Sequence, residues 1–362
     1  MTAVRPAPHP RDARAQAPRG PAVAGIELAA GAVHVVVARR EDSRLRIVGR
    51  GDASVPEGAV SGGLVADRAA AADAMRDAFA TAEHLQRAER AVVAIDSDDM
   101  RTYHALTSFE RDDLRSAMGS GEEARAVREA AASAVTRAAA AAEEDPALRG
   151  VATAKLHDHV AALAMDGHGL PTLTGHRGRL VDVWTDVTIA SVVVTGAATS
   201  ALEAARRRGT VISGAYALGR LVAASGTTDA GIVRLGEDLT SVAVLREGRV
   251  IATRVFALGR AALAGRVGTA DEDARVWSDC VVASLLGLDG PPPGRWLFVG
   301  VPDEQLALPN ALGQRIGEIR GDTVDIRPLT LALASRVYGD SGLRSEDLVA
   351  AGAAAIAAGL YE

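Results

Sequence analysis

Apolar residues near the start of the chain predict a small sheet with one covering helix. Residues 23–37 form two predicted strands joined by a small-residue turn at 29–31, because β-branched residues flank that turn. Further strands are expected at about 45–49 and 91–95. Between them, apolar positions recur at near-helical spacing and predict a helix over 67–89. This segment is therefore expected to be a compact α/β unit.

A second segment, residues 231–259, repeats the order of strand, small-residue turn, strand, hairpin and strand. Gly248 lies in the predicted hairpin turn between two alternating runs. A helix over about 271–286, a buried strand at 296–300 and an Ala-rich helix over 348–360 follow. A repeated unit in a chain of 362 residues, more than one core usually fills, predicts two lobes whose sheets face each other.

Residues 104–186 differ in character from both units. A polar Ala/Glu/Arg helix is expected over about 121–143, followed by two separate strand-like runs within 151–165 and a Gly-rich connection. We interpret this segment as a small α+β module inserted into the first lobe. After it, the pattern predicts a strand over 187–195 and a helix over 197–208.

These patterns divide the chain into six expected segments. In order they are an Arg/Pro tail (1–22), the first-lobe core (23–103), the inserted subdomain (104–186), the first-lobe return with an interlobe helix (187–222), the second lobe (223–344) and a closing helix (345–362). The tail holds five prolines and four arginines without an apolar segment, so it is expected to be disordered and is not a secretory signal.

Composition and charge exclude several classes of function. The net charge of −6 argues against a nucleic-acid binder, which would carry a basic domain. Cys280 is the single cysteine, so neither a disulfide framework nor a Cys-based zinc site is expected, and a cytoplasmic location fits. The longest uncharged stretch, Val187 to Leu202, is too short to cross a bilayer.

The most specific motif is the Gly-rich run MDGHGLPTLTGHRGRLVDV in the inserted module. It is similar to the D-G…P-x-G-x-x-G-x-x-L run of the subdomain that is specific to FtsA, a cell-division protein of the actin/Hsp70 superfamily. The matching positions are Asp166, Gly167, Gly175, Gly178 and Leu180. The strand–turn–strand GIELAAGAVHVVVA, the GGLV and AVVAID segments, SGAYALGRL and the closing AAAIAAGLY also follow the FtsA order along most of residues 23–362.

This resemblance implies an α/β, actin-like (ribonuclease H-like) two-lobe fold with an FtsA-type α+β subdomain inserted in the first lobe. It also implies that Asp166, Gly167, Gly175 and Gly178 belong to a surface for protomer or partner contacts. The second-lobe helical subdomain, used in the family to hold the FtsZ tail, is shortened to about 262–292. The family's C-terminal membrane helix is missing, so direct membrane attachment is not expected, and a partner would recruit the chain to the inner membrane face.

The loops that bind nucleotide phosphates in the family are altered here. The first loop, Asp-Ile-Gly-Thr-Ser in the family, is Glu27-Leu28-Ala29-Ala30-Gly31. Glu27 keeps a carboxylate that could hold a metal-bound water, but the hydroxyl donors are gone. The adenosine-side Gly-Gly-Gly loop corresponds to Gly300-Val301-Pro302, in which the proline removes an N–H donor.

The second loop departs furthest. The family's Asp-Ile-Gly-Gly-Gly-Thr-Thr-Asp becomes a run from Arg234 through Gly236 and Thr240 to Ser241, with acids at 237 and 238. A carboxylate about 4 Å from a phosphate would repel it by roughly 4 kcal/mol per charge pair at a surface-like dielectric. Arg234 has two open interpretations, a phosphate contact or a surface or interlobe salt bridge, and the adjacent Glu237 and Asp238 favour the salt bridge.

Other candidate groups have plainer interpretations. His157, His159, His168 and His176 lie within 20 residues, but no Cys or carboxylate stands at ligand spacing, so we assign no metal site. Asp96, Asp98 and Asp99 follow a buried strand, where turn formation competes with Mg²⁺ binding. Ser213 lacks a G-x-S-x-G elbow and is not assigned as a nucleophile.

We therefore expect an FtsA-like scaffold in cell division that is impaired as an ATPase and has no catalytic residue. Its expected partners are FtsZ or other division proteins and further copies of itself. One alternative is a divergent ATPase that retains ATP and Mg²⁺. The other is a PilM-like cytoplasmic adaptor of type IV pilus assembly, which shares the actin core.

Overall fold

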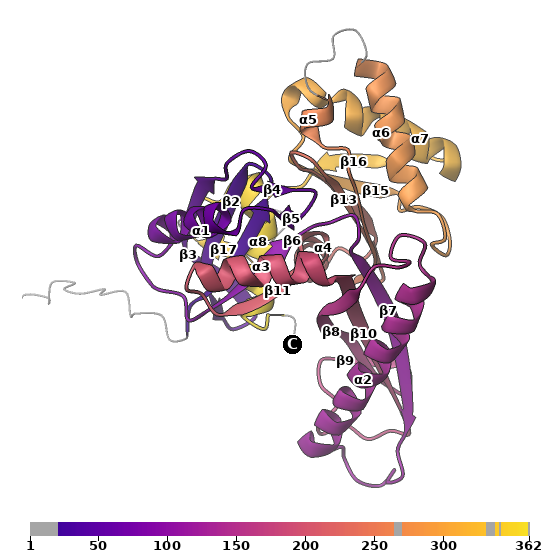
Figure 1. Cartoon of the computed structure of the whole chain (residues 1–362). Coiled ribbons are helices and arrows are strands. Elements are labelled where there is room, and N and C mark those ends of the chain that lie inside the picture. The colour runs from indigo at the N-terminus through magenta and orange to yellow at the C-terminus, as the bar shows by residue number, and fades with distance from the viewer. Residues whose placement is uncertain (1–20, 264–269, 331–336, 340–341, 361–362) are drawn as a thin grey trace, which may run out of the picture.

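The computed structural model describes residues 21–263, 270–330, 337–339 and 342–360. These residues form two lobes and an elongated third module that projects away from them (Figure 1). The first lobe is built on a six-stranded sheet with the strand order β11-β6-β1-β2-β3-β17. Its strands are β1 (Val23–Ala29), β2 (Ala32–Glu41), β3 (Arg44–Ser54), β6 (Arg90–Ile95), β11 (Gly209–Ser213) and β17 (Val337–Gly339), with a separate hairpin of β4 (Val60–Ser61) and β5 (Leu64–Val65).

Two helices cover the outer face of the first sheet. α1 (Arg68–Ala82) and α3 (Val192–Ala204) pack side by side and share an apolar core with the sheet. α1 begins where it does because the Asp67 carboxylate accepts hydrogen bonds from the first free backbone N–H groups of the helix.

The second lobe is built on a five-stranded sheet with the order β14-β13-β12-β15-β16. Its strands are β12 (Ala230–Leu235), β13 (Thr240–Arg246), β14 (Arg249–Phe256), β15 (Arg295–Val299) and β16 (Asp325–Pro328). α6 (Ala270–Ser284) and α7 (Ala307–Arg320) cover its outer face over a core that contains Trp277 and Trp296. The short elements are α5 (Arg260–Leu263), η1 (Asp303–Gln305) and η3 (Ser345–Asp347).

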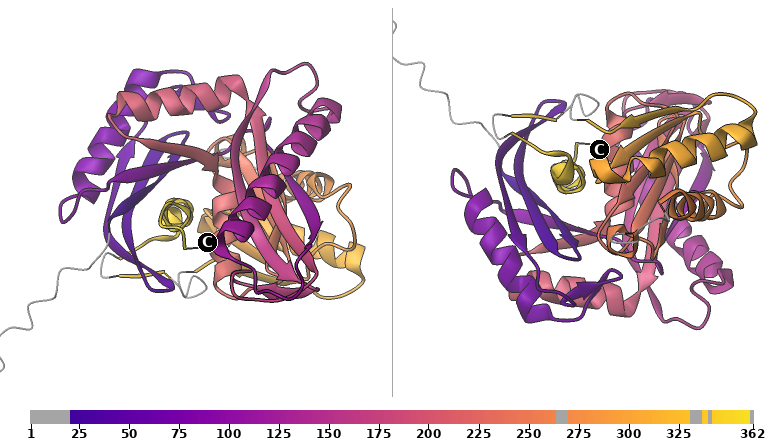
Figure 2. Two further views of the ribbon diagram at one scale, coloured as in Figure 1. Left: turned by 90° about the horizontal axis from the view of Figure 1, so that it is seen from below. Right: turned by 90° about the horizontal axis from the view of Figure 1, so that it is seen from above.

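Two helices between the lobes hold the sheets together. α4 (Gly214–Ala224) and α8 (Leu348–Ala357) form one apolar cluster with residues of both sheets, and Figure 2 shows α8 (yellow) between them. α8 can lie this close to β1 only because Gly25 has no side chain. A Cβ on Gly25 would lie 1.9 Å from the carbonyl oxygen of Ala350. This packing leaves the lobes little freedom to slide past each other.

The projecting module is a four-stranded sheet, β7-β10-β8-β9, with one long helix on one face. The elements are β7 (Arg101–Glu110), α2 (Ser120–Glu144), β8 (Thr153–Met165), β9 (His168–Leu170) and β10 (Leu180–Ser191). α2 buries an alanine at every fourth position from 126 to 142, so its small side chains let it lie close to the sheet. β7 and β10 run past the expected limits of 104–186 into the lobes.

Several expected boundaries are wrong. α1 stops at Ala82 instead of continuing to 89, because Glu83 ends the helix and its carboxylate accepts a hydrogen bond from the Ala88 N–H. β8 is one strand, and register shifts against β10 accommodate the irregularity that suggested two runs. The strand predicted over 187–195 ends at Ser191, whose hydroxyl caps α3.

The helical layer of the second lobe is also larger than expected. The sequence predicts one helix within 262–292, and α6 confirms it. α7 lies outside that range, was not predicted, and packs along α6. Residues 264–269 of the predicted subdomain and the tail at 1–20 lie outside the described residues.

Candidate functional site

The two lobes face each other at one edge of their sheets. β1 and β6 are parallel in the first lobe, as are β12 and β15 in the second, and the carboxyl ends of β1, β6 and β12 meet at the cleft. Ligands of open α/β sheets bind at this edge. Both altered loops line the cleft, the first through residues 27–30 and the second through residues 234 and 237–239. The structure therefore brings the first two altered loops together at one cleft, and their assignment as a former nucleotide site stays a prediction.

An interlobe salt bridge occupies this place. Arg234, near the end of β12, forms an ion pair with Glu27 of β1. Glu27 is only 3% exposed. Burial lowers the pKa of Arg234 to about 10, with a smaller contribution from nearby Arg260, so the guanidinium stays charged at neutral pH. Of the two interpretations of Arg234, the geometry matches the salt bridge, and the carboxylate of Glu27 is engaged there too.

The two acids of the second loop also have protein partners. The carboxylate of Asp238 accepts a hydrogen bond of 2.5 Å from the backbone N–H of Gly62, in the β4–β5 hairpin of the other lobe. Glu237 pairs with Arg260 at 3.0 Å. The Asp238–Gly62 bond is a second link across the cleft, formed by a residue that stands where the family has glycine.

Gly236 and Thr240 have structural roles within the second lobe. A Cβ on Gly236 would lie 2.9 Å from a guanidinium nitrogen of Arg234, so glycine makes room for the salt bridge. Thr240 is fully buried; its hydroxyl donates to the carbonyl oxygen of Leu258 at 2.5 Å and accepts from the indole N–H of Trp277 at 3.0 Å. Its hydroxyl is therefore fully used inside the second lobe.

The remaining predicted loop residues are placed by backbone geometry. Gly31 forms the β1–β2 turn with a φ of 80°, where a residue with a side chain would be strained, and Ala29 lies beside it at the cleft. Gly300, after β15, has a φ of 75°, and a Cβ there would lie 2.6 Å from the carbonyl oxygen of Leu235. Of these three residues only Ala29 lines the cleft, and none of them offers a charged or hydroxyl group to a ligand.

Asp96 reaches the cleft, but α4 uses its carboxylate. Asp96 follows β6 and accepts hydrogen bonds from the backbone N–H of Ala215 at 2.9 Å and from the hydroxyl of Ser213 at 3.3 Å. Burial raises its pKa, and these hydrogen bonds oppose the rise. Asp98 is exposed and is not part of the cleft lining. Of the three aspartates, only Asp96 contributes to the site, as a cap of the interlobe helix.

The space that remains in the cleft is about 20 Å³, enough for one water molecule. Small-molecule sites usually hold about 300–1,000 Å³. Within the described residues, no group of three or more His, Cys, Asp and Glu side chains could hold a metal ion. The residues of this cleft therefore do not fit ATP with Mg²⁺.

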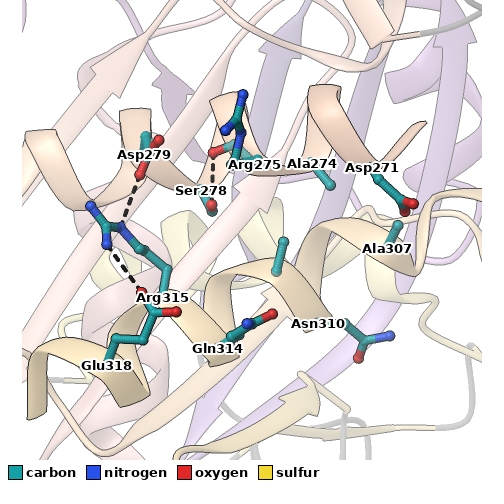
Figure 3. A pocket seen from close by; sticks show the side chains of 11 residues that line it. Asp271, Ala274, Arg275, Ser278, Asp279, Ala307, Asn310, Gln314, Arg315 and Glu318 are labelled. Atoms are coloured by element: carbon teal, nitrogen blue, oxygen red, sulfur yellow. Dashed lines mark hydrogen bonds and ion pairs between the residues drawn. The ribbon is translucent and has the colours of Figure 1, made fainter. Parts of the chain in front are cut away.

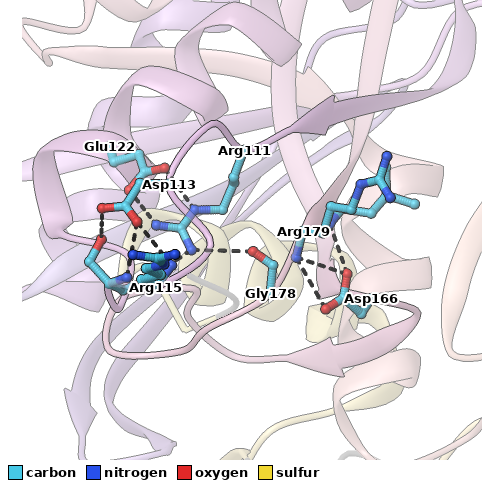
Figure 4. A network of polar contacts seen from close by, with 9 residues as sticks. Arg111, Asp113, Arg115, Glu122, Asp166, Gly178 and Arg179 are labelled. Atoms are coloured by element: carbon cyan, nitrogen blue, oxygen red, sulfur yellow. Dashed lines mark hydrogen bonds and ion pairs between the residues drawn. The ribbon is translucent and has the colours of Figure 1, made fainter.

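The Gly-rich motif of the projecting module builds its own loop (Figure 4). The carboxylate of Asp166 accepts hydrogen bonds from the backbone N–H groups of Arg179 and Leu180. Gly167 and Gly175 have φ values of 79° and 86°. A Cβ on Gly178 would lie 2.3 Å from the Met165 side chain. The four predicted partner-binding residues thus have structural reasons for their identity, and partner binding stays a prediction.

An arginine joins this loop to the rest of the module. Arg111, after β7, pairs with the carboxylate of Glu122 in α2 at 2.7 and 2.9 Å and reaches the carbonyl oxygen of Gly178 at 3.3 Å. The motif therefore forms part of a rigid end of the module, distant in the fold from the cleft (Figure 1).

A buried polar cluster between the module and α4 was missed. The hydroxyl of Tyr216 donates to Asp186 at 2.8 Å, and His104 contacts the same carboxylate at 2.7 Å. His157 and His159 lie against the Tyr216 ring, with centroids 4.9 and 6.3 Å away. Burial lowers the pKa of His157 to about 4 and of His159 to about 3, so both are neutral. Asp186, a charged residue within the apolar β10, is the sequence signal that could have revealed this cluster.

A hollow of about 670 Å³, larger than the cleft, lies between α6 and α7 (Figure 3). Its wall includes Arg315, which bridges Asp279 and Glu318 at 3.0 and 3.1 Å. Small and polar side chains line the rest. The hollow is an open groove on the outer face of the second lobe and is separate from the cleft.

The architecture is a mixed α/β, actin-like ATPase fold. The structure of the PilM–PilN type IV pilus biogenesis complex matches it with a TM-score of 0.56 at 17% identity, covering 93% of this chain and 98% of that chain. The ethanolamine utilization protein EutJ from Carboxydothermus hydrogenoformans matches with a TM-score of 0.45 at 15% identity, covering 92% and 89%. A nucleotide-free diol dehydratase-reactivating factor matches with a TM-score of 0.47 at 10% identity, covering 94% and 100%.

The match to the PilM–PilN complex confirms the predicted fold class, and FtsA is not singled out. No protein-family model matches the sequence, and no curated protein matches it significantly. None of the helices in the described residues is long and apolar enough to cross a membrane.

Proposed function

We propose that this chain is a nucleotide-independent adaptor with an actin-like fold, comparable to PilM and acting through protein partners in a type IV pilus-like assembly. The observation that carries the proposal is the Arg234–Glu27 ion pair across a cleft of about 20 Å³. The charges that would hold a metal and phosphates instead neutralise each other and join the lobes.

The structural likeness supports the choice of assembly. The PilM–PilN complex matches nearly the full length of both chains. By analogy, the partner would be a PilN-type protein, which would also bring the chain to its place of action.

A scaffold of cell division is the second candidate. It is favoured by the Asp166–Gly178 loop, which is ordered by its own hydrogen bonds and has the FtsA-type pattern. In that case the module would contact FtsZ, another division protein or a second copy of this chain.

Calorimetry of the full chain with ATP and with ADP, each with Mg²⁺, tests the first part of the proposal. We expect no binding at the cleft up to millimolar nucleotide. Micromolar binding that Arg234→Ala changes would overturn it, because the nucleotide would then be in the cleft.

Co-purification with the tagged chain from its native cells tests the second part. A PilN-type protein among the partners supports the pilus assignment. FtsZ or another division protein supports the second candidate, and Gly178→Leu, which would distort the module loop, should then weaken capture. Gly196→Leu is the control, because Gly196 is exposed on α3, has no positive φ, and a Cβ there would meet no atom within 4 Å.

A further inference from the structure

A basic hollow of about 410 Å³ lies at the opposite edge of the first-lobe sheet from the cleft. It surrounds the amino ends of β6 and β11, whereas the cleft lies at their carboxyl ends. Five arginines and one glutamate line it together with Phe79 and two alanines: Arg87, Arg90, Arg206, Arg207, Arg208 and Glu89. A concentration of positive charge is unexpected in a chain with a net charge of −6.

One of the five arginines has a structural task. Arg207 pairs with both carboxylate oxygens of Glu83 at 2.7 Å and lies over the ring of Phe79 at 3.9 Å. It therefore joins the ends of α1 and α3 and forms the floor of the hollow. Its charge is neutralised by Glu83, so it adds little attraction for a ligand.

The other four arginines carry free charges. Arg87, Arg90, Arg206 and Arg208 are exposed, and within the described residues none of their side chains has a hydrogen bond or ion pair. Two helices, α1 and α3, end beside them, and each carboxyl end carries the equivalent of about half a negative charge. The helix ends thus offset about one of four positive charges, and Glu89 offsets one more.

The backbone at Arg206 gives a second, independent observation. α3 ends in a Schellman motif: the N–H of Arg206 bonds to the carbonyl oxygen of Glu203, and the N–H of Arg207 bonds to that of Leu202. Arg206 has a φ of 57°, in the left-handed region where glycine usually ends such a helix. An arginine at this position is less favourable for the fold and presents its side chain at the hollow.

We propose that this hollow, which we call the arginine hollow, binds an anion that carries two or more phosphate groups. Guanidinium groups match phosphate oxygens in charge and in paired donor geometry. The volume falls within the usual range for small-molecule sites and far exceeds that of a single phosphate ion. The ligand is either a free phosphorylated molecule or a phosphorylated headgroup at a membrane surface. The site is independent of the cleft and of the adaptor proposal.

The test uses the full chain with two probes, tripolyphosphate by calorimetry and cardiolipin vesicles, whose headgroup carries two phosphates, by sedimentation, with phosphatidylcholine vesicles as the reference without net charge. Arg206→Gly/Arg208→Ala removes two free charges and keeps the Arg207–Glu83 pair. The matched control is Arg128→Ala, an exposed arginine on α2 without a partner in the described residues. Thermal unfolding confirms that each variant is folded.

We expect binding that weakens as salt rises, because exposed charges are screened. Each lost guanidinium should weaken it about fivefold, so the double variant should bind about 25-fold less tightly, and the control should match the wild type. Tripolyphosphate binding identifies a free ligand, and binding to cardiolipin vesicles alone identifies a headgroup. The proposal is overturned if neither probe binds at about 20 mM salt, or if the double variant binds as tightly as the wild type.

This experiment also separates the arginine hollow from the cleft. If ATP binds the full chain and the double variant abolishes that binding, its phosphates lie in the arginine hollow and the cleft remains without nucleotide. If the double variant leaves ATP binding intact and Arg234→Ala changes it, the adaptor proposal fails while the arginine hollow is judged by tripolyphosphate.

Discussion

The two ends of strand β6 lie next to two arginine-containing regions with opposite properties. At its carboxyl end, Arg234 is mostly buried, with 16% of its side chain exposed, and is paired with Glu27 across a closed cleft. At its amino end, Arg90 and its neighbours are exposed and line an open hollow. A buried guanidinium requires a partner, so it becomes part of the protein's own structure. An exposed guanidinium retains its charge for an outside ligand. Arginine thus closes the cleft at one end of β6 and leaves free positive charge in a hollow at the other end.

Breaking the buried pair should have the largest effect. Arg234→Ala leaves the carboxylate of Glu27 buried without its partner, and we expect a loss of about 3–5 kcal/mol in the free energy of unfolding. Chemical denaturation followed by circular dichroism measures it.

The matched variant removes both charges. Glu27→Leu/Arg234→Met should recover most of the loss, because an apolar pair can replace a buried ion pair at little cost. If Arg234→Ala alone costs less than about 1 kcal/mol, the pair behaves as an exposed one and does not close the cleft.

Protonation tests a second kind of site, the half-buried ring of His157, whose Nε2 has no hydrogen-bond partner within the described residues. The pKa of His157 is about 4, well below the 6.5 of the unfolded chain. Between these values the unfolded state binds the proton and the folded state does not, so stability falls as pH drops below 6.5 and is complete above it. At 1.4 kcal/mol per unit, His157 should contribute a loss of about 2 kcal/mol between pH 6.5 and pH 5.

His157→Phe supplies the control for this pH dependence. The ring keeps its packing on Tyr216, which lies 4.9 Å away, but takes no proton. The stability of this variant should fall less between pH 7 and pH 5 than that of the wild type, measured by unfolding at each pH. Equal pH profiles would show that His157 is not buried in its neutral form.

The sequence predicted the elements well where pattern and burial coincide. Both strand–turn–strand units, α2 and α8 occur where the sequence pattern predicts them, and α4 occurs where the FtsA resemblance implies an interlobe helix. α3 shows why boundaries fail: Val192 and Val193 have the composition of a strand, yet they are 44% and 59% exposed on a helix that Ser191 caps. Local capping decided the boundary, and apolar content did not reveal it.

The sequence indicated which loops would meet between the lobes, and the structure places residues of both loops at one cleft. That these loops once bound phosphate, and that this binding is impaired, stays a prediction. The partner of Arg234 could not be read from the chain, because Glu27 is more than 200 positions away in sequence and adjacent only after the lobes meet. The arginine hollow was missed for the same reason, since its two runs, 87–90 and 206–208, meet only through parallel pairing of β6 and β11.

The second link across the cleft should contribute less than the ion pair. Asp238→Ala removes the acceptor of the Gly62 N–H, and we expect a loss of about 1–2 kcal/mol with faster hydrogen exchange at Gly62. Glu237→Ala is the neighbouring control, because its pair with Arg260 is exposed and should contribute under about 1 kcal/mol. Unchanged exchange at Gly62 in Asp238→Ala would mean that the bond does not hold the lobes together.

The smallest expected effect is a gain in stability instead of a loss. It separates the charge of Arg206 from the strain of its left-handed backbone. Arg206→Gly removes a left-handed residue that costs about 1–2 kcal/mol, while the freer unfolded chain costs about 0.4–1 kcal/mol, so stability should rise by about 0.5 kcal/mol. Arg206→Ala keeps the left-handed strain and should leave stability near that of the wild type. Both variants should bind tripolyphosphate equally weakly, because both lack the guanidinium. A loss of stability in Arg206→Gly would show that the side chain supports the fold, and it would then have a structural task like that of Arg207.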